Sequence, residues 1–165
     1  MHMMDGAVLA KILLLLWIAN GTPILAARLL GKHWATPVDF GFHLRDQHPL
    51  FGESKTWRGL LSAILTTTPA AMSLGFDLGW GLLLGTLAMA GDLLSSFIKR
   101  RLGLAPSERA RLLDQVPESM LPVMALAAHG FISWLEGAIV TALFVFTDML
   151  FSLLLYRLKI RKRPY

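Results

Sequence analysis

The sequence predicts an all-α integral membrane protein with about five transmembrane helices, and three observations support this fold class. The chain of 165 residues is 55% hydrophobic and only 16% charged, whereas roughly a quarter of the residues in an average soluble domain are charged. The charges are also unevenly distributed, since Asp77 is the only charged residue between Gly59 and Gly91. Apolar windows of about 20 residues with few charges are typical of membrane-spanning helices. We therefore expect a single transmembrane domain that covers residues 1–165.

The predicted spans follow the apolar runs in chain order. They are Ala7–Leu30, Arg58–Phe76, Leu78–Ile98, Met120–Leu135 and Gly137–Tyr156. The first contains Lys11, which leaves a signal peptide as an alternative, but its apolar run is longer than a usual signal core. The fourth is the shortest, and only a turn at Glu136 separates it from the fifth.

Basic residues predict the orientation of the chain. Of the 16 Lys and Arg residues, 15 lie in or beside three segments, which are 31–57, 99–119 and the tail from Arg157; Lys11 is the exception. By the positive-inside rule, the N-terminus faces outside, while two long loops and the C-terminus face the cytoplasm of a multi-pass cell-membrane protein. The net charge of +5 and the terminal "RLKIRKR" fit an anchor to anionic lipids. No groove-reading pattern accompanies this charge, so a nucleic-acid partner is not expected.

A polar stripe interrupts the third predicted span in "GDLLSSFIKRR". Asp92, Ser95, Ser96 and Lys99 have the spacing i, i+3, i+4 and i+7, which places them on one helical face. This face is either an internal salt bridge on a packing surface or a site for a metal ion and phosphates. Intramembrane carboxylates are functional candidates by default, which favours the second interpretation.

The two long loops contain further charged residues at the same predicted depth. The first loop reads "VDFGFHLRDQHPLFGESKTWRG"; its "GESKT" lacks the spacing of a Walker phosphate loop. In "RLLDQVPES" of the second loop, Asp114 is either a helix cap or a second metal carboxylate facing Asp92. His129 and Asp148 are predicted to pair with each other inside the bundle.

Together these motifs resemble one family. The chain contains "ANGTP", "DFG", "FGESKTWRG", "GDLLSSFIKRRLGL" and "LDQ" in this order. These blocks strongly resemble the CDP-archaeol synthase family, which consists of five-helix membrane cytidylyltransferases, and they also resemble the larger CDP-diacylglycerol synthases. Two departures are visible: this chain has "DQH" at Asp46–His48 where the family loop usually reads "DGR", and "LDQ" lacks the second acid of the larger synthases.

The resemblance implies transfer of CMP from CTP to a phosphorylated, archaetidic-acid-like ether lipid, which gives CDP-archaeol and pyrophosphate with Mg²⁺ as cofactor. It implies metal ligands at Asp92 and Asp114, and catalytic phosphate contacts at Lys99, Arg100 and Lys55. The implied substrate-binding residues are Ser96, Thr56, Arg58, Asn20, Thr22, Asp39 and Asp46. CTP and the lipid phosphate are both anionic, so cations must offset their repulsion. The attacking phosphate oxygen is already ionised near pH 7, so no general base is required.

Other functions remain as alternatives. The same chemistry on an ester phosphatidate would make the chain similar to a CDP-diacylglycerol synthase. A small membrane transporter would usually show internal repeats, and none is found in the sequence. An alcohol phosphotransferase should show a D-G-x-x-A-R series, which is also absent from the sequence. A homodimer is an oligomeric state that the sequence leaves open.

Overall fold

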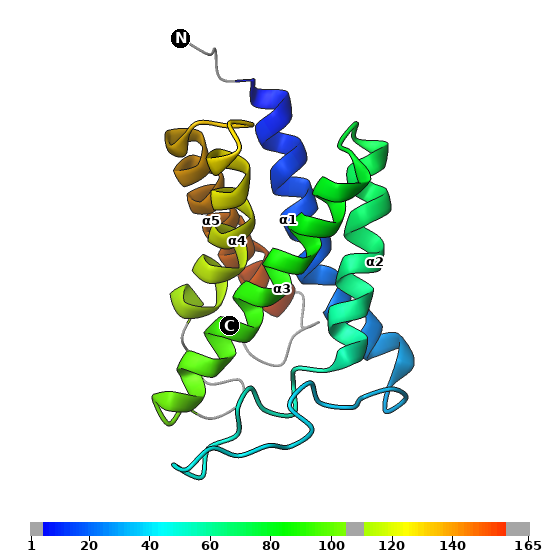
Figure 1. Cartoon of the computed structure of the whole chain (residues 1–165), viewed down its shortest axis with the longest axis vertical. Helices are drawn as coiled ribbons and strands as arrows, with labels where there is room; N and C mark the ends of the chain where they lie inside the picture. The colour runs from blue at the N-terminus through cyan, green and yellow to red at the C-terminus, as the bar shows by residue number, and fades with distance from the viewer. Residues whose placement is uncertain (1–4, 105–110, 158–165) are drawn as a thin grey trace.

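The computed structural model describes residues 5–104 and 111–157, and over these residues it contains five α-helices and no β-strand. The helices are α1 (Gly6–Leu30), α2 (Trp57–Ser73), α3 (Leu78–Arg101), α4 (Arg111–Ala128) and α5 (Trp134–Arg157). They form one bundle, with the loop between α1 and α2 lying across its lower end (Figure 1). The prediction of an all-helical chain with five helices is confirmed.

Short polar side chains begin several of these helices. Asp5 caps α1 by accepting a hydrogen bond from the Ala7 N–H, and Thr56 caps α2 by accepting from the Gly59 N–H. At the start of α5, the Ser133 hydroxyl accepts from the Glu136 N–H while the Glu136 carboxylate accepts from the Ser133 N–H. This reciprocal pair is a capping box, which satisfies backbone donors that the first turn leaves free.

Glycines in the left-handed region end three of the helices. Gly75, Gly103 and Gly130 have φ values of 91°, 70° and 75°. After α4, the Gly130 N–H donates to the Ala127 carbonyl and the Phe131 N–H donates to the Leu126 carbonyl. Gly75 and Gly103 take part in the same pair of bonds after α2 and α3. This is the Schellman arrangement, which favours glycine because the left-handed conformation is costly for other residues.

The fourth predicted span was wrong at both ends. Met120–Leu135 was expected, but α4 starts at Arg111 and ends at Ala128. The helix continues through Pro117 and Pro122, and each proline only removes one N–H donor to the carbonyl four residues earlier. Within the described residues, three helical stretches are long and apolar enough to cross a membrane, namely Gly6–Leu30, Leu78–Arg101 and Trp134–Phe151.

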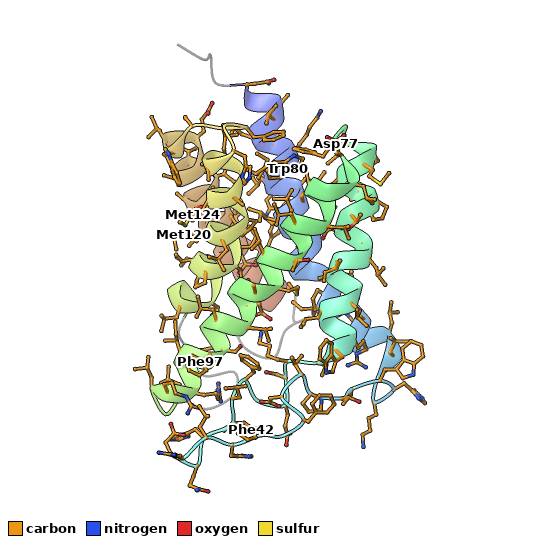
Figure 2. The ribbon with its side chains drawn as sticks, viewed as in Figure 1. Phe42, Asp77, Trp80, Phe97, Met120 and Met124 are labelled. Carbon is orange, nitrogen blue, oxygen red and sulfur yellow. The ribbon has the colours of Figure 1, made fainter. Side chains whose placement is uncertain are left out.

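Helix α3 lies at the centre of the bundle and packs mainly against α2 and α4 (Figure 1). Asp77 and Trp80 mark one end of this helix and Phe97 lies near the other (Figure 2). A buried apolar cluster fills the half of the bundle near Trp80. Its members are Leu9, Ile12, Leu15, Leu16, Ala71, Leu84, Val123, Leu126, Ala127, Ile132, Val140 and Phe144. Most of the buried polar side chains lie in the other half, next to the first loop.

Candidate active site

The last three turns of α3 form a polar foot, which we define as Asp92, Ser95, Ser96, Lys99 and Arg100. Four of these side chains belong to buried residues, because Ser95, Ser96, Lys99 and Arg100 are each at most 7% exposed. The Ser95 hydroxyl donates to the Asp92 carbonyl at 2.8 Å, which satisfies this serine within its own helix. A buried cluster of this polarity requires partners from neighbouring elements.

Two ion pairs join the polar foot to those neighbours. Lys55 of the first loop pairs with Asp92, and Lys99 lies 2.5 Å from the carboxylate of Asp114 on α4. The structure therefore brings together four residues that the sequence placed in three separate motifs. In this arrangement each carboxylate is neutralised by an ammonium group, which lowers the cost of holding the charges in a partly buried position.

Glu118 is a neighbour of the polar foot that was not predicted from the sequence. It follows Asp114 by four residues on α4, and its carboxyl group interacts electrostatically with that of Asp92. Two carboxyl groups in contact repel each other when both are ionised, so they share a proton or need a cation between them. The spacing D-x-x-x-E would have revealed Glu118 if residues 111–119 had been assigned to a helix rather than to a loop.

A close approach of α3 and α4 places these carboxyl groups together. A Cβ atom built on Gly91 would lie 2.2 Å from the Pro117 carbonyl oxygen and 2.7 Å from the Glu118 Cα. Both neighbours are backbone atoms, so the helices can only approach this closely at glycine. As a result, Asp92 directly follows the contact point on α3, and Glu118 belongs to the contact on α4.

Arg100 is a buried cation that faces the first loop. Its Cδ lies 3.9 Å from the position that a Cβ atom on Gly52 would occupy. Within the described residues, the buried Nε of Arg100 has no hydrogen-bond acceptor. A buried guanidinium nitrogen without an acceptor is suited to an incoming anion, because leaving such a donor unsatisfied is costly.

Asp39 organises the first loop from within. Its carboxylate accepts hydrogen bonds from the N–H groups of Gly41, Phe51 and Gly52 at 3.0, 2.8 and 2.9 Å. Burial acts to raise the pKa of Asp39, but the bonds from Gly52, Phe51 and Gly41 together hold that pKa below its ordinary value. The residue that the family resemblance assigned to substrate binding therefore has a loop-forming role in this arrangement.

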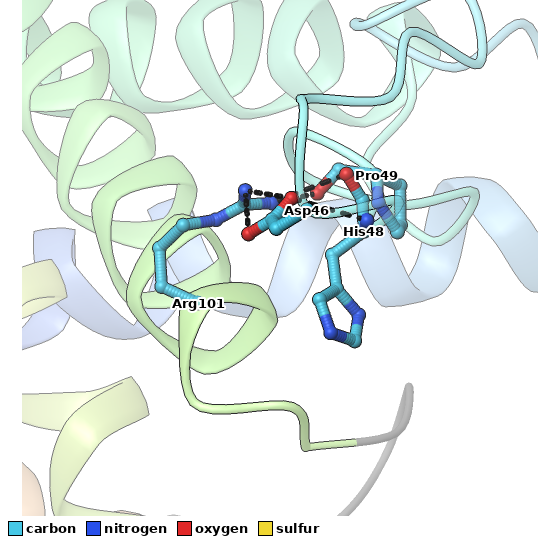
Figure 3. A network of polar contacts seen from close by, with 4 residues as sticks. All are labelled: Asp46, His48, Pro49 and Arg101. Atoms are coloured by element: carbon cyan, nitrogen blue, oxygen red, sulfur yellow. Dashed lines mark hydrogen bonds and ion pairs between the residues drawn. The ribbon is translucent and has the colours of Figure 1, made fainter.

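Asp46 lies at the tip of the first loop, where it meets the end of α3 (Figure 3). Arg101 donates to both carboxylate oxygens of Asp46 and to the carbonyls of His48 and Pro49. Partial burial acts to raise the pKa of Asp46, but the His48 N–H and the Arg101 charge hold it below its ordinary value. Asp46 is thus engaged by α3 rather than turned toward Asp92.

The remaining predicted residues lie around the junction of α1 and α2. Thr56 is the α2 cap, and Arg58 donates to the carbonyls of Gly31 and His33 at the end of α1. Asn20 and Thr22 each donate to a carbonyl one turn earlier in α1. Their side chains are structurally engaged, so substrate contacts for these four residues stay predictions.

The predicted pairing of His129 with Asp148 was wrong. Asp148 accepts a hydrogen bond from Gln115 of α4, while the ring of His129 packs edge-on against Trp80 with a centroid distance of 5.3 Å. His129 follows the C-terminus of α4 and Asp148 lies well inside α5, so the two residues are at different heights in the bundle. Asp148 instead fixes α5 to the segment of α4 that carries Asp114.

Comparisons with known proteins agree with this architecture. The family profile described as CarS-like CDP-archaeol synthase matches residues 7–165. A CDP-archaeol synthase from Pyrobaculum calidifontis is 30% identical over 168 residues, which cover 95% of this chain and 98% of the relative. A CDP-archaeol synthase from Pyrobaculum arsenaticum is 32% identical, with 90% of this chain and 92% of the relative covered.

A solved structure also matches the fold. It is described as giving structural insight into an intramembrane enzyme for archaeal membrane lipids biosynthesis. The two chains are 29% identical and superpose with a TM-score of 0.70, and the match covers 84% of this chain and 89% of the other. The bundle described above is therefore similar to that of a membrane-embedded enzyme.

Proposed function

The chain belongs to the CarS-like CDP-archaeol synthase family, and we infer from this membership how its polar foot performs the reaction. The protein is a membrane-embedded cytidylyltransferase that transfers the cytidylyl group from CTP to a phosphorylated archaeol lipid. The product is CDP-archaeol, and pyrophosphate is released. We assign this reaction to the polar foot because two ion pairs, Lys55–Asp92 and Lys99–Asp114, meet there beside the buried Arg100.

The reaction is a displacement at phosphorus. An oxygen of the lipid phosphate forms a new bond to the α-phosphorus of CTP, and the bond from that phosphorus to the bridging oxygen of the β-phosphate breaks. The electron pair of the broken bond leaves with pyrophosphate. Because the attacking oxygen is already ionised, the site needs no base and acts through positioning and charge stabilisation.

The cations at the polar foot are placed to receive this charge. Lys55 and Lys99 hold carboxylates in the arrangement described above, and Arg100 has a buried donor without an acceptor. When the triphosphate enters, these groups can turn to its oxygens over a short distance. Arg100 then gains the acceptor that its buried Nε lacks, so substrate binding also satisfies a group of the protein.

Mg²⁺ fits the donor set on the other side of the polar foot. Among the described residues no three carboxylate or imidazole groups form a metal cluster. Mg²⁺ needs no such cluster, because it is usually held by one or two carboxylates together with substrate phosphates and water. Asp92 and Asp114 would supply these ligands, and the contact between Asp92 and Glu118 is one that a cation would relieve. When bound, the ion would offset negative charge on the phosphates of CTP.

The polar foot faces the cytoplasm in this proposal. CTP is soluble and the acceptor has its chains in the bilayer, so the site has to lie at the membrane surface where both can arrive. The foot occupies the end of α3 next to the first loop, away from the buried apolar cluster (Figure 2). The distribution of Lys and Arg residues supports a cytoplasmic position for this end of the bundle.

Turnover of labelled CTP by the purified protein tests the assignment. We expect CDP-lipid formation from a phosphorylated archaeol ether lipid. Thin-layer analysis of the product formed with an ester phosphatidate as acceptor shows whether the enzyme discriminates between the two kinds of lipid chain.

Asp92→Asn keeps the shape of the side chain but removes its charge. We expect it to reduce turnover by ~10²–10³, as the loss of one strong electrostatic contact in an active site does. Lys99→Ala should weaken both CTP binding and turnover.

The matched control is Arg163→Ala, which removes a cation from the C-terminal tail. This variant should retain turnover. If Asp92→Asn folds normally, as judged by its thermal unfolding, and keeps both its turnover and its Mg²⁺ dependence, then Asp92 is a structural residue and the proposed site is wrong.

A further inference from the structure

We propose that Arg101 is a positioning residue for the reaction, which holds the tip of the first loop against α3 and thereby sets where Lys55 meets Asp92. This inference rests on the proposed function of the polar foot. It assigns to Arg101 and Asp46 a role that is separate from substrate contact.

Arg101 donates to four acceptor oxygens on three residues of one short turn. Its Nη1 lies 2.7 and 2.6 Å from the two carboxylate oxygens of Asp46, and its Nη2 lies 2.6 Å from the Pro49 carbonyl and 3.3 Å from the His48 carbonyl (Figure 3). One turn earlier on α3, the ring of Phe97 lies 5.3 Å from the guanidinium carbon. A planar guanidinium group supported on an aromatic ring is suited to this geometry, and an ammonium group is not.

The turn that Arg101 holds is strained on its own. Gln47, between Asp46 and His48, has a φ of 63°, and such left-handed conformations persist in residues other than glycine only when their surroundings enforce them. The turn is closed by hydrogen bonds from the Gln47 N–H to the Leu44 carbonyl and from the Leu44 N–H to the His48 carbonyl. Arg101 binds the Asp46 carboxylate and the His48 and Pro49 carbonyls, which come together only while the turn is closed. These hydrogen bonds would break if the turn opened.

The constraint is transmitted to Lys55 through a short segment. Phe51 and Gly52 follow Pro49 and are held by Asp39, and the Lys55 N–H donates to the Gly52 carbonyl at 3.1 Å. Lys55 then pairs with Asp92. The segment is therefore fixed to α3 at both ends, by Arg101 and by Asp92, which are separated by nine residues or ~13 Å of helix.

Three consecutive cations at the end of α3 consequently have three different neighbours. Lys99 meets Asp114, Arg100 packs against Gly52, and Arg101 meets the turn at Asp46. Consecutive helical residues differ by about 100° in direction, so this separation follows from the helix itself. Among the ion pairs of residues 5–104 and 111–157, the Arg101–Asp46 pair is also the most exposed, with side-chain exposures of 23% for Arg101 and 44% for Asp46. Because exposed pairs contribute little to global stability, the effect of breaking this pair should be local.

The test compares Arg101→Ala, Arg101→Lys and Asp46→Asn in the full-length protein. We expect Arg101→Ala and Asp46→Asn to raise the KM for CTP roughly tenfold with kcat little changed, since a misplaced loop weakens the assembly of the site. Arg101→Lys keeps the positive charge but cannot donate to Asp46 and Pro49 through two separate nitrogens as the guanidinium group does. Its KM for CTP should therefore lie between those of Arg101→Ala and the unaltered protein. The matched control is Arg45→Ala, which removes an exposed cation from the same turn and should leave KM unchanged.

A second measurement does not depend on turnover. Trypsin cleaves after Arg45, and we expect this cleavage to accelerate in Arg101→Ala and Asp46→Asn while the thermal unfolding temperature stays the same. If cleavage accelerates but the unaltered protein does not turn over CTP, the proposed function has failed and the loop attachment stands. If Arg101→Ala raises KM but Asp46→Asn does not, Arg101 contacts substrate directly and the inference is overturned. Unchanged cleavage in both variants would overturn it as well.

Discussion

Asp39 shows how one carboxylate can determine the shape of a whole loop. It holds the N–H groups of Phe51 and Gly52, which come shortly before Lys55 in the chain. Because these bonds favour the ionised form, the pKa of Asp39 is lower in the folded protein than in the unfolded chain. The folded state then binds fewer protons, so the stabilisation is present above the ordinary value of 3.8 and is lost as the pH falls through the lowered pKa.

This predicts an acid-induced loosening of the first loop. The hydrogen-exchange protection factors of Phe51 and Gly52, corrected for the intrinsic exchange rate, should stay constant between about pH 7 and 5 and fall below about pH 4. Asp39→Asn should lower this protection already at neutral pH. The control is Asp77→Asn, because the Asp77 side chain makes no capping hydrogen bond. Equal protection in Asp39→Asn and the unaltered protein would contradict the role given to Asp39.

Some single residues of the site could be predicted from sequence, and others could not. Lys55, Asp92 and Lys99 lie in motifs whose charge is unusual beside an apolar span, and the structure brings these three residues together in the polar foot and its ion pairs. Glu118 was missed because its place beside Asp92 depends on the path of α4, which two prolines obscured. The contacts of Asp39 could not be predicted either, because hydrogen bonds to a loop backbone leave no periodic signal in the sequence.

Among the helices, the closest approach of α3 to α4 occurs at Gly91. Gly91 contacts the backbone of Pro117 and Glu118, where no side chain can move aside. Gly91→Ala should therefore force the two helices apart, and overpacking of this kind typically costs about 1–3 kcal/mol. We expect a lower thermal unfolding temperature together with a large loss of CTP turnover, because the shift separates Asp92 from Glu118.

The control for this prediction lies on the same helix. Gly79 is near the start of α3, and a Cβ atom there would have no neighbour within 4 Å. Gly79→Ala should be neutral or slightly stabilising, because alanine favours the helix over glycine. If Gly91→Ala unfolds and turns over CTP as Gly79→Ala does, the close approach does not position the site.

Helix boundaries were predictable where the terminal signal was strong. The first and third spans were predicted to within a few residues, because each is a long apolar run with few charged residues. The end of α4 just before Gly130 could have been predicted from "HGF", which has the same form as "LGF" after α2 and "LGL" after α3. The start of α4 could not have been predicted in the same way. Its first turns carry polar residues that contact the foot of α3 rather than lipid, so they do not form an apolar run.

For the whole molecule, the charge distribution predicts one orientation in the membrane. Reporter fusions after Lys32, Arg109 and Arg163 should all report the cytoplasm, and a fusion after Asp77 should report the outside. The reason is that 15 of the 16 Lys and Arg residues lie on or beside the segments assigned to the cytoplasm. A cytoplasmic signal at Asp77 would contradict both this orientation and the cytoplasmic position of the polar foot.

The order of the ion pairs along the chain has a consequence for biogenesis. Lys55 precedes Asp92 and Lys99 precedes Asp114, so during synthesis each lysine emerges from the ribosome before the carboxylate that it neutralises. An unpaired carboxylate in a spanning helix is costly, and Lys55 has already been synthesised when Asp92 of α3 enters the membrane. We therefore expect a Lys55→Ala variant to be inserted into the membrane less efficiently than the unaltered chain, as well as to turn over CTP more slowly.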